Sequence, residues 1–430
     1  MDRKIKIAVI GLGSRGNTYA ESAVLFPDEC EIVACADILP DRVKRFGDKY
    51  GVAEDMRFSS GEELLAREKL ADVAFICTMD RLHYPHATAA LNRGYHLLLE
   101  KPISPVLSEC IEIADLAKEK GLEVIVCHVM RYTNFYRKLK ELVDSGIIGD
   151  IVCVEAYERV VYWHQAHSFV RGNWSNAERS SPMILQKCCH DMDILYWIIG
   201  KKSVAVSSFG SLSHFKASEA PEGATERCTE ACPHYHTCPY SVDKNYLEWG
   251  RRGVFTWPID VVSQVPTMEA LEEALRTGPY GRCVYHCDND VVDHQVVNIL
   301  FEDGVTANFS MCPFTAEGGR KIVVMGTKGD LNGFLDQDKI VFSPFIDRFS
   351  DHSVTYPTED VEDNFGHGGG DYAIIRDLLA LLTGKHDVGS SLTRVSDSIE
   401  SHVIALAAEE SRAAGGKLVR SEEFIRENRK

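Results

Sequence analysis

The sequence predicts an α/β protein in two parts, a doubly wound parallel sheet followed by an α+β domain with an open, largely antiparallel (mixed) sheet. Residues 1–130 alternate short apolar runs with amphipathic segments, which is the pattern of βαβ units. From residue 131 onward the strand-like runs lengthen, hairpin turns join them, and helices return only near the end. A chain of 430 residues exceeds one ordinary core, so we expect domains at 1–130 and 131–430.

Each part is predicted from short apolar runs bounded by turn residues. The expected strands of the first domain are Lys4–Ile10, Glu31–Ala36, Val73–Cys77, Tyr95–Leu99 and Leu122–His128. The helices between and after them are Asp41–Tyr50, Glu62–Arg67, His83–Arg93 and Ser104–Lys120. Right-handed connections of this kind place the strands parallel.

In the second domain, Val291–Phe301 and Val305–Met311 flank the turn Glu302–Gly304 and predict an antiparallel hairpin. Further expected strands are Ile151–Tyr157, Ser203–Ser211, Lys321–Met325 and Lys339–Pro344, and the expected helices are Asp371–Leu382 and Thr393–Ala414. Residues 212–286 fit neither pattern and are expected to be a Cys-rich insertion.

Charge and hydropathy exclude two classes of partner. A net charge of −17 argues against nucleic acid, whose phosphates the chain would repel. No run reaches the roughly 18 apolar residues that cross a bilayer, and the apolar run near the N-terminus is too short for a signal peptide. Most of the 14 cysteines lie singly in apolar runs, as reduced thiols do. We therefore expect a cytoplasmic protein.

A glycine-rich turn follows the first expected strand and opens a helix, which is typical of a Rossmann dinucleotide-binding domain. Its residues are Gly11, Leu12, Gly13, Ser14, Arg15 and Gly16. The free N–H groups of the helix N-terminus suit a pyrophosphate. Asp37 ends the second strand, where an acid accepts hydrogen bonds from the adenosine ribose and repels a 2′-phosphate. NAD is therefore favoured over NADP; the alternative is a nucleotide-free domain in which Asp37 caps a helix.

A second motif, Glu100-Lys101-Pro102, ends the fifth strand-like run at the carboxyl edge of the sheet, where open α/β sheets bind ligands. With this motif and the glycine turn, the chain resembles the glucose–fructose oxidoreductase / inositol dehydrogenase / MocA (Gfo/Idh/MocA) family over nearly its whole length, apart from the insertion. The other matching features are Thr78 with His83, Gly94-Tyr95-His96, Arg131-Tyr132, Ser145–Gly149, Gly326–Gly329 and Ala408–Val419.

The resemblance implies that nicotinamide and substrate meet between a Rossmann domain and a mixed-sheet domain. It gives Lys101 contacts to both substrate hydroxyl and cofactor, and it makes His190 the base that takes the hydroxyl proton. Four residues before the histidine this chain has Gln186 in place of the family's acid, and Lys187 flanks the site as a further catalytic candidate. Thr78, His83 and Glu100 are expected near the cofactor. The alternative for His190 is simple packing in its helix.

Other candidates line the expected substrate pocket. Tyr162 and His164 combine aromatic planes with hydrogen-bond donors, which suits a polyol, and Arg171 could pair with a substrate carboxylate. His367 precedes a glycine run that resembles a segment of NAD-dependent α-N-acetylgalactosaminidases in the same superfamily. The expected function is an NAD(P)-dependent dehydrogenase acting on a carbon–hydroxyl of a sugar, inositol or related polyol. Two alternatives are redox-assisted glycoside cleavage without net redox change and a non-catalytic sensor. The resemblance also implies a homodimer or homotetramer.

The insertion carries a group of cysteines without an obvious core around them. Cys228, Cys232 and Cys238 lie close together in sequence, with two histidines among them. Thiolate and imidazole ligands suit a tetrahedral zinc ion, and Cys-Pro pairs also occur beside iron–sulfur clusters. A structural zinc site is therefore expected, with reduced, metal-free cysteines as the alternative.

Overall fold

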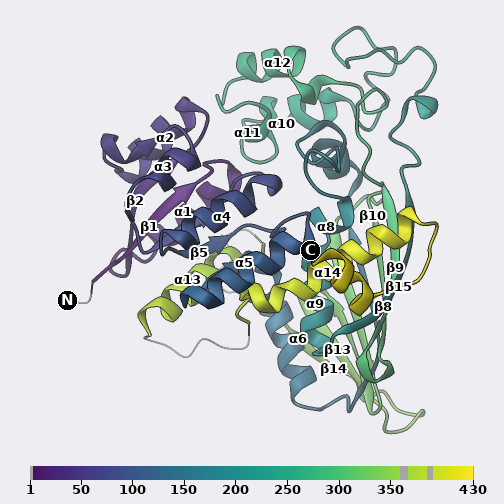
Figure 1. The fold of residues 1–430 in the computed structure, drawn as a ribbon. Coiled ribbons are helices and arrows are strands. Elements are labelled where there is room, and N and C mark those ends of the chain that lie inside the picture. Colours follow the sequence, from purple (N-terminus) through teal and green to yellow (C-terminus); the bar gives the residue numbers. More distant parts are fainter. Residues whose placement is uncertain (1–2, 359–366, 385–390, 430) are drawn as a thin grey trace.

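Two sheets organise the chain in the computed structural model, which describes residues 3–358, 367–384 and 391–429 (Figure 1). The first sheet is parallel throughout, in the order β3-β2-β1-β4-β5-β6. Its strands are β1 (Ile5–Ile10), β2 (Cys30–Ala36), β3 (Arg57–Phe58), β4 (Val73–Ile76), β5 (His96–Leu99) and β6 (Val124–Val126). The strand order reverses between β1 and β4, so the carboxyl ends of these two strands frame a ligand crevice. The predicted parallel sheet is confirmed.

Helices cover both faces of this sheet, which explains why strand β4 is wholly apolar and buried. One face carries α1 (Ser14–Val24), α2 (Pro40–Tyr50) and α13 (Gly370–Thr383). The other carries α3 (Gly61–Ala66), α4 (His83–Asn92) and α5 (Leu107–Lys120). Helix α13 comes from the far end of the sequence: its Ile374 and Leu378 share a core with Tyr19 of α1.

The second sheet has nine strands in the order β14-β13-β12-β11-β7-β10-β9-β8-β15. Only β7 and β10 pair in parallel, so the expectation of a mixed, largely antiparallel sheet is confirmed. The strands are β7 (Ile151–Arg159), β8 (Ser203–Ser211), β9 (His294–Phe301), β10 (Thr306–Cys312), β11 (Gly319–Gly326), β12 (Gly329–Phe334), β13 (Lys339–Pro344), β14 (Val354–Pro357) and β15 (Val419–Arg420).

One face of this sheet packs on helices and forms the largest core. The helices lie on the side that faces the first sheet (Figure 1). They are α6 (Asn134–Asp144), α8 (Met183–Gln186), α9 (Cys189–Ile199), α14 (Val395–Ala413) and α15 (Ser421–Asn428). Strand β9 alternates buried and exposed residues, which is the burial pattern of a sheet covered on one face. Within the described ranges, no helix is long and apolar enough to cross a membrane.

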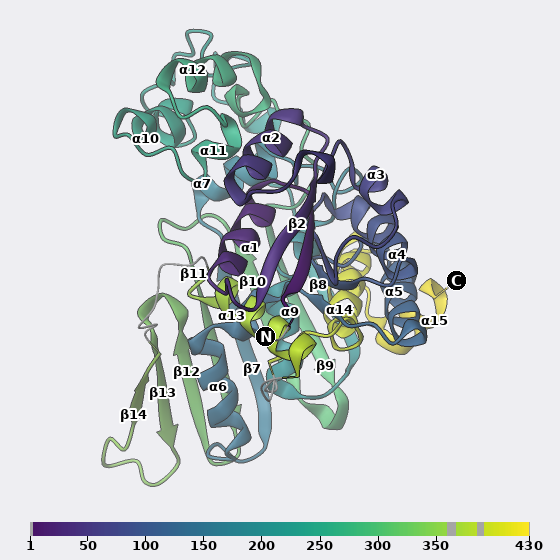
Figure 2. The same cartoon turned by 90° about the vertical axis from the view of Figure 1, so that its left-hand side faces the viewer.

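The insertion between β8 and β9 has a small core of its own, which the sequence did not reveal. Val242, Tyr246 and Leu271 are fully buried in it. Its helices are α10 (Glu248–Arg251), α11 (Ile259–Val262) and α12 (Met268–Thr277). The insertion lies beside helix α2 of the first sheet (Figure 2), where Arg45 donates a hydrogen bond to Gln264. It therefore spans from the second domain to the edge of the first.

Candidate active site

The glycine turn after β1 forms a cradle in which each glycine has a separate role. Gly11 has φ +90°, and a Cβ there would lie 2.4 Å from the carbonyl oxygen of Cys77. A Cβ on Gly16 would lie 2.1 Å from the carbonyl oxygen of Gly11, so this glycine permits close packing of helix on strand. A Cβ on Gly13 would meet only an Arg42 nitrogen, at 3.8 Å, among the described residues. The middle glycine therefore leaves room for a pyrophosphate to approach the backbone.

Helix α1 begins at Ser14 directly behind this cradle. Its N-cap, Gly13, supplies no side-chain hydrogen bond to the first turn. The first N–H groups of a helix have no partner within the helix and attract anions. The backbone at Ser14 and Arg15 thus fits a dinucleotide pyrophosphate, as the sequence predicts.

Asp37 follows β2 and is oriented by backbone donors. Its carboxylate accepts hydrogen bonds from Leu12 N at 2.8 Å and Leu39 N at 2.9 Å, and Arg42 lies 3.6 Å away. The side chain is 7 % exposed at the edge of the glycine cradle. This is where the ribose of a bound dinucleotide would be recognised.

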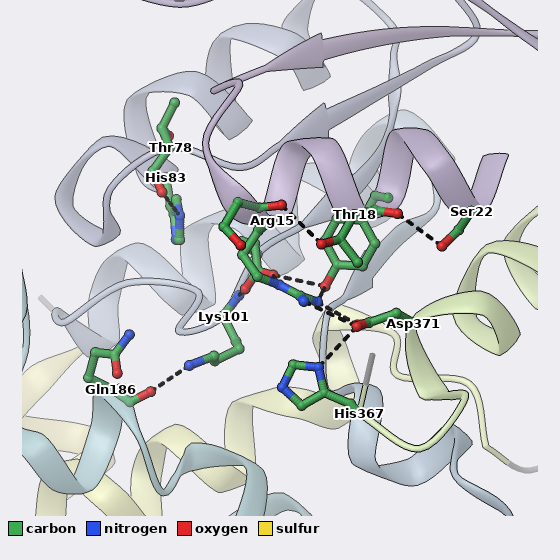
Figure 3. Close-up of polar contacts among 12 residues, drawn as sticks. Arg15, Thr18, Ser22, Thr78, His83, Lys101, Gln186, His367 and Asp371 are labelled. Atoms are coloured by element: carbon green, nitrogen blue, oxygen red, sulfur yellow. Dashed lines mark hydrogen bonds and ion pairs between the residues drawn. The ribbon is translucent and has the colours of Figure 1, made fainter. Parts of the chain in front are cut away.

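A buried ion network joins the cradle to the second motif (Figure 3). The Arg15 guanidinium donates to Glu100 at 2.7 Å and to Asp371 of α13 at 2.5 Å. Burial opposes ionisation of both acids, but Arg15, together with Lys101 at Glu100 and His367 at Asp371, outweighs it and lowers the pKa of both carboxyl groups. Both acids are therefore charged. The side chain of Arg15 anchors the fold here, while its backbone remains at the cradle.

His83 connects two loops at the carboxyl edge of the sheet. Its Nε2 is 2.9 Å from the carbonyl oxygen of Thr78, and its Nδ1 is 2.7 Å from that of Pro102. The imidazole is fully buried. It therefore holds the Thr78 loop against the segment that carries Lys101, a positioning role.

Lys101 is the point where the two domains meet. Its Nζ donates to the backbone carbonyl oxygen of Gln186, the last residue of α8, at 2.7 Å (Figure 3). Its backbone N–H donates to Glu100 at 2.8 Å. The ammonium group thus extends from the dinucleotide sheet toward the helix segment that precedes His190.

His190, in the first turn of α9, is 6 % exposed, and its Nδ1 has no partner among the described residues. Burial, followed by the charge of Lys101, holds its pKa well below the usual value, so the imidazole is neutral. The His128 ring packs 5.8 Å from it, edge to face. Sequence reasoning missed His128, although its place just after β6 at the carboxyl edge is a signal that could have found it.

Lys187 belongs to a network of ion pairs that ends at Asp191, the residue after His190. Its Nζ is 3.5 Å from Glu158 of β7, and Glu158 also pairs with Arg320 at 2.7 Å. Arg320 in turn binds Asp191 at 2.8 Å. Lys187 is thus tied to an acid, in an arrangement the sequence did not indicate.

The candidates for the substrate pocket lie in two places: His367 is beside His190, whereas Tyr162 and His164 are on one short helix. His367 lies near His190, with 6.3 Å between ring centroids, and its Nδ1 is 3.0 Å from Asp371. His164 ends the short helix α7 (Tyr162–His164); burial, then the charges of Lys187, His167 and Lys101, lowers its pKa. Tyr162 begins this helix and packs on a tyrosine of the insertion.

Arg171 is not brought to Lys101. It ends the π-helix η4 (Gln165–Arg171), and its guanidinium donates to the carbonyl oxygens of Arg282 at 2.7 Å and Tyr240 at 2.8 Å. It is 1 % exposed. Its partners lie in and beside the insertion, so the expected contact with a substrate carboxylate at the Lys101 site has no support.

The zinc prediction at Cys228, Cys232 and Cys238 is not supported. Across the described residues, no group of three or more His, Cys, Asp or Glu side chains is placed to hold a metal ion. Cys228 packs in the apolar core of the insertion, and its Sγ lies 3.6 Å from the Arg171 guanidinium. The three thiols are not gathered around one point with further ligands, which is the physical reason for the correction.

Proteins of known sequence and structure carry the same two-domain arrangement. Residues 140–418 match "Oxidoreductase family, C-terminal alpha/beta domain". The YteT protein of Bacillus subtilis, named as an oxidoreductase, is 23% identical over 86% of this chain and 88% of its own. Inositol 2-dehydrogenase of Salmonella typhimurium is 25% identical over 46% of this chain, which spans about half of that relative (55%).

Solved structures of other proteins have the same fold as this chain. An oxidoreductase domain protein from Kribbella flavida has a TM-score of 0.71 at 16% identity, covering 97% of this chain and 99% of that one. An Agrobacterium radiobacter oxidoreductase in complex with NAD+, L-tartaric acid and magnesium has a TM-score of 0.68 at 14% identity, covering 98% and 100%. Residues 5–128 match "Oxidoreductase family, NAD-binding Rossmann fold". With both of its domains matched, the chain belongs to the Gfo/Idh/MocA family of NAD-binding oxidoreductases.

Proposed function

We propose that this protein is an NAD-dependent dehydrogenase that transfers a hydride between nicotinamide and a carbon–hydroxyl of a sugar, inositol or related polyol. The observation that carries the proposal is that Lys101 donates to the carbonyl oxygen of Gln186 in the segment before His190, and that its charge helps to lower the pKa of His190. One group comes from each domain, so a hydroxyl bound between them would meet both a cation and a base. The inositol 2-dehydrogenase relative supports the choice of substrate class.

The residues divide the chemistry between them. NAD, when bound, supplies the hydride acceptor. The neutral imidazole of His190 takes the hydroxyl proton, because its lowered pKa leaves it unprotonated. The ammonium of Lys101 stabilises negative charge developing on that oxygen. Tyr162, His164 and Gln186 are proposed to contact the substrate, and Lys187 adds positive charge nearby.

NAD is proposed over NADP because of Asp37. Two backbone donors hold its carboxylate at the mouth of the cradle, which favours hydrogen bonding to a ribose diol. A 2′-phosphate there would meet a negative charge. Arg42, 3.6 Å from Asp37, opposes this preference in part.

A second candidate is redox-assisted glycoside cleavage, in which a sugar is oxidised, loses its glycosidic oxygen by elimination, and is reduced again. The observation that favours it is a further imidazole, His367, next to His190 and hydrogen-bonded to Asp371. A histidine paired with a buried carboxylate is suited to proton transfer at a second position on the sugar.

One assay separates the two candidates. Purified enzyme is incubated with a panel of sugars, inositols and aryl glycosides, and both NADH and released aglycone are measured. A dehydrogenase yields one NADH per turnover with free polyols. A redox glycosidase releases aglycone without accumulating NADH. Tight NAD binding with no conversion of any substrate would contradict both proposals.

We also propose that the protein is a cytoplasmic homodimer or homotetramer. The cysteines are free, including eight that are buried, which supports a reducing compartment. Assembly is supported by apolar side chains on the outer face of the nine-stranded sheet. Phe209 of β8 and Val296 of β9 are direct cross-strand neighbours and are 57% and 40% exposed.

A further inference from the structure

A basic cavity lies outside the site described above, between the insertion and the segment that follows η4. Its volume is about 460 Å³, within the range of small-molecule sites. Two of its arginines lie on one segment: Arg171 ends η4, and Arg179 lies eight residues farther along the chain. The other two, Arg227 and Arg282, belong to the insertion, the teal region at the top of Figure 1.

The charge of this cavity is opposite to that of the whole chain. Four arginines are among the residues that line it, and the one acid among them is Asp288. That carboxylate pairs with Arg179 at 2.7 Å and Arg282 at 2.8 Å. These two hydrogen bonds lower the pKa of Asp288, so it stays ionised and neutralises one charge. Among the lining residues, four cations therefore face one anion, in a chain whose net charge is −17.

Two of the arginines have no carboxylate partner in the described part of the chain. The hydrogen bonds of Arg171 and Arg227 go to backbone carbonyl oxygens and, for Arg171, to the Cys228 sulfur. Three buried guanidinium nitrogens have no acceptor among the residues that the structure describes: Arg171 Nη1, Arg227 Nε and Arg282 Nε. A buried cation without an anion is costly, and donors left without acceptors add to that cost.

We propose that this cavity binds a small phosphorylated ligand through its phosphoryl group. A phosphoryl dianion offers three acceptor oxygens and two charges, which matches several guanidinium forks better than one planar carboxylate does. The bound group would compensate the positive charge of the lining arginines, of which Arg179 is 58% exposed and Arg282 is 30% exposed. Its site is separate from Lys101, so the proposal does not depend on the redox function.

The position of the cavity connects it to the active site without being part of it. The segment between Arg171 and Arg179 carries Trp174, whose indole lies 3.3 Å from Asp80 on the first domain. Ser181, just beyond, donates to the same carboxylate at 2.6 Å. An anion held by Arg179 and Arg282 would therefore connect this loop, which contacts the first domain, to the insertion.

Calorimetric titration of the full chain with inorganic phosphate tests the proposal, with sodium chloride matching ionic strength and citrate as a carboxylate probe. We expect saturable phosphate binding that Arg227→Gln weakens about tenfold or more, in line with loss of a charge-assisted contact. Arg276→Gln is the matched control, because this insertion arginine is 65% exposed and pairs only with Glu273 among the described residues. It should bind phosphate like the wild type.

Arg179→Gln provides a second test at an exposed position, where substitution leaves the core intact. It should also weaken phosphate binding, while NAD binding stays unchanged in both variants and confirms that they fold. The proposal is overturned if phosphate binds no better than chloride, if citrate binds and phosphate does not, or if Arg227→Gln and Arg179→Gln both retain wild-type affinity.

Discussion

At the scale of single residues, Lys101 and His190 carry the proposed chemistry from opposite domains. We expect Lys101→Met and His190→Ala each to reduce turnover by about 100-fold or more, the effect usual for acid–base groups. NAD affinity should change little, because neither side chain belongs to the glycine cradle. The double variant should lose less than the product of the single effects, since both groups act on one proton transfer. Steady-state kinetics and fluorescence titration with NAD provide the measurements.

Lys118→Met is the control for these variants, because Lys118 is an exposed lysine on α5. It should keep wild-type turnover. If His190→Ala retained near-normal turnover and the same pH profile, His190 would be structural, and the base would have to be sought at Lys187 or Lys101.

Because the pKa of His190 is lowered, we expect the acid limb of the kcat/KM profile to lie at lower pH than for an ordinary histidine. The imidazole stays neutral in the folded protein below pH 6.5, the ordinary histidine value, so kcat/KM should persist there and fall only at lower pH. Below pH 6.5 the unfolded chain binds the proton more readily, so the free energy of unfolding should decrease as pH falls. Kinetics and denaturant unfolding from pH 5 to 8 measure both effects. An acid limb at or above pH 6.5 would contradict the assignment.

A substitution of Asp37 tests the proposed preference for NAD over NADP. Asp37→Ala removes an acceptor for the ribose diol together with a charge that repels a 2′-phosphate. It should weaken NAD by about 1–3 kcal/mol and weaken NADP less. Dissociation constants for both cofactors are the measurement. Equal weakening of NAD and NADP would show that Asp37 acts only by holding the Leu12 and Leu39 backbone.

At the scale of elements, the local sequence pattern was sufficient to predict the bounds of regular strands. The bounds of β8 and β13 coincide with the predicted runs Ser203–Ser211 and Lys339–Pro344. β12 was missed because its sequence, GDLNGF, contains few strand-forming residues; it is stabilised by pairing with β11 and β13 on both sides.

The candidate site was predictable where one motif carries the role, as at Lys101 and the glycine cradle. It was not predictable where partners are far apart in sequence. The pairing of Arg15 with Asp371 spans 356 residues, and no local pattern contains it. The same holds for Arg171, whose buried partners become visible only when the insertion folds over it.

Two glycines of the cradle allow a test that separates packing from binding. Gly16→Ala would place a Cβ 2.1 Å from the Gly11 carbonyl oxygen, so it should lower stability by about 1–3 kcal/mol. Gly13→Ala meets nothing closer than 3.8 Å and should leave stability nearly unchanged. It should nevertheless weaken NAD, because the methyl group occupies the approach of the pyrophosphate. Thermal unfolding and NAD titration of both variants test this contrast; identical effects would contradict it.

At the scale of the whole molecule, several later segments of the chain contact its first domain. Helix α13 packs on α1, and the Arg394 backbone bridges to Ile125 in β6. The insertion contacts α2 through Arg45 and Gln264. These connections add to the hydrogen bond from Lys101 to the Gln186 carbonyl oxygen, which joins the segments that carry Lys101 and His190. The domain boundary at residue 130 remains a prediction.

The outer face of the nine-stranded sheet provides the last prediction, on assembly. Phe209 and Val296 form an exposed cross-strand apolar pair, and such a surface is better buried against a second copy than left in water. Phe209→Asp or Val296→Asp should therefore convert the assembly to a smaller species, because a charge would be buried without a partner. Neither side chain lies in the core, so both variants should fold. Light scattering after gel filtration gives the mass. Phe349→Asp, at an 84% exposed position in the loop between β13 and β14, should leave the mass unchanged. A wild-type monomer would refute the proposed assembly, and a wild-type mass in both sheet variants would place the interface elsewhere.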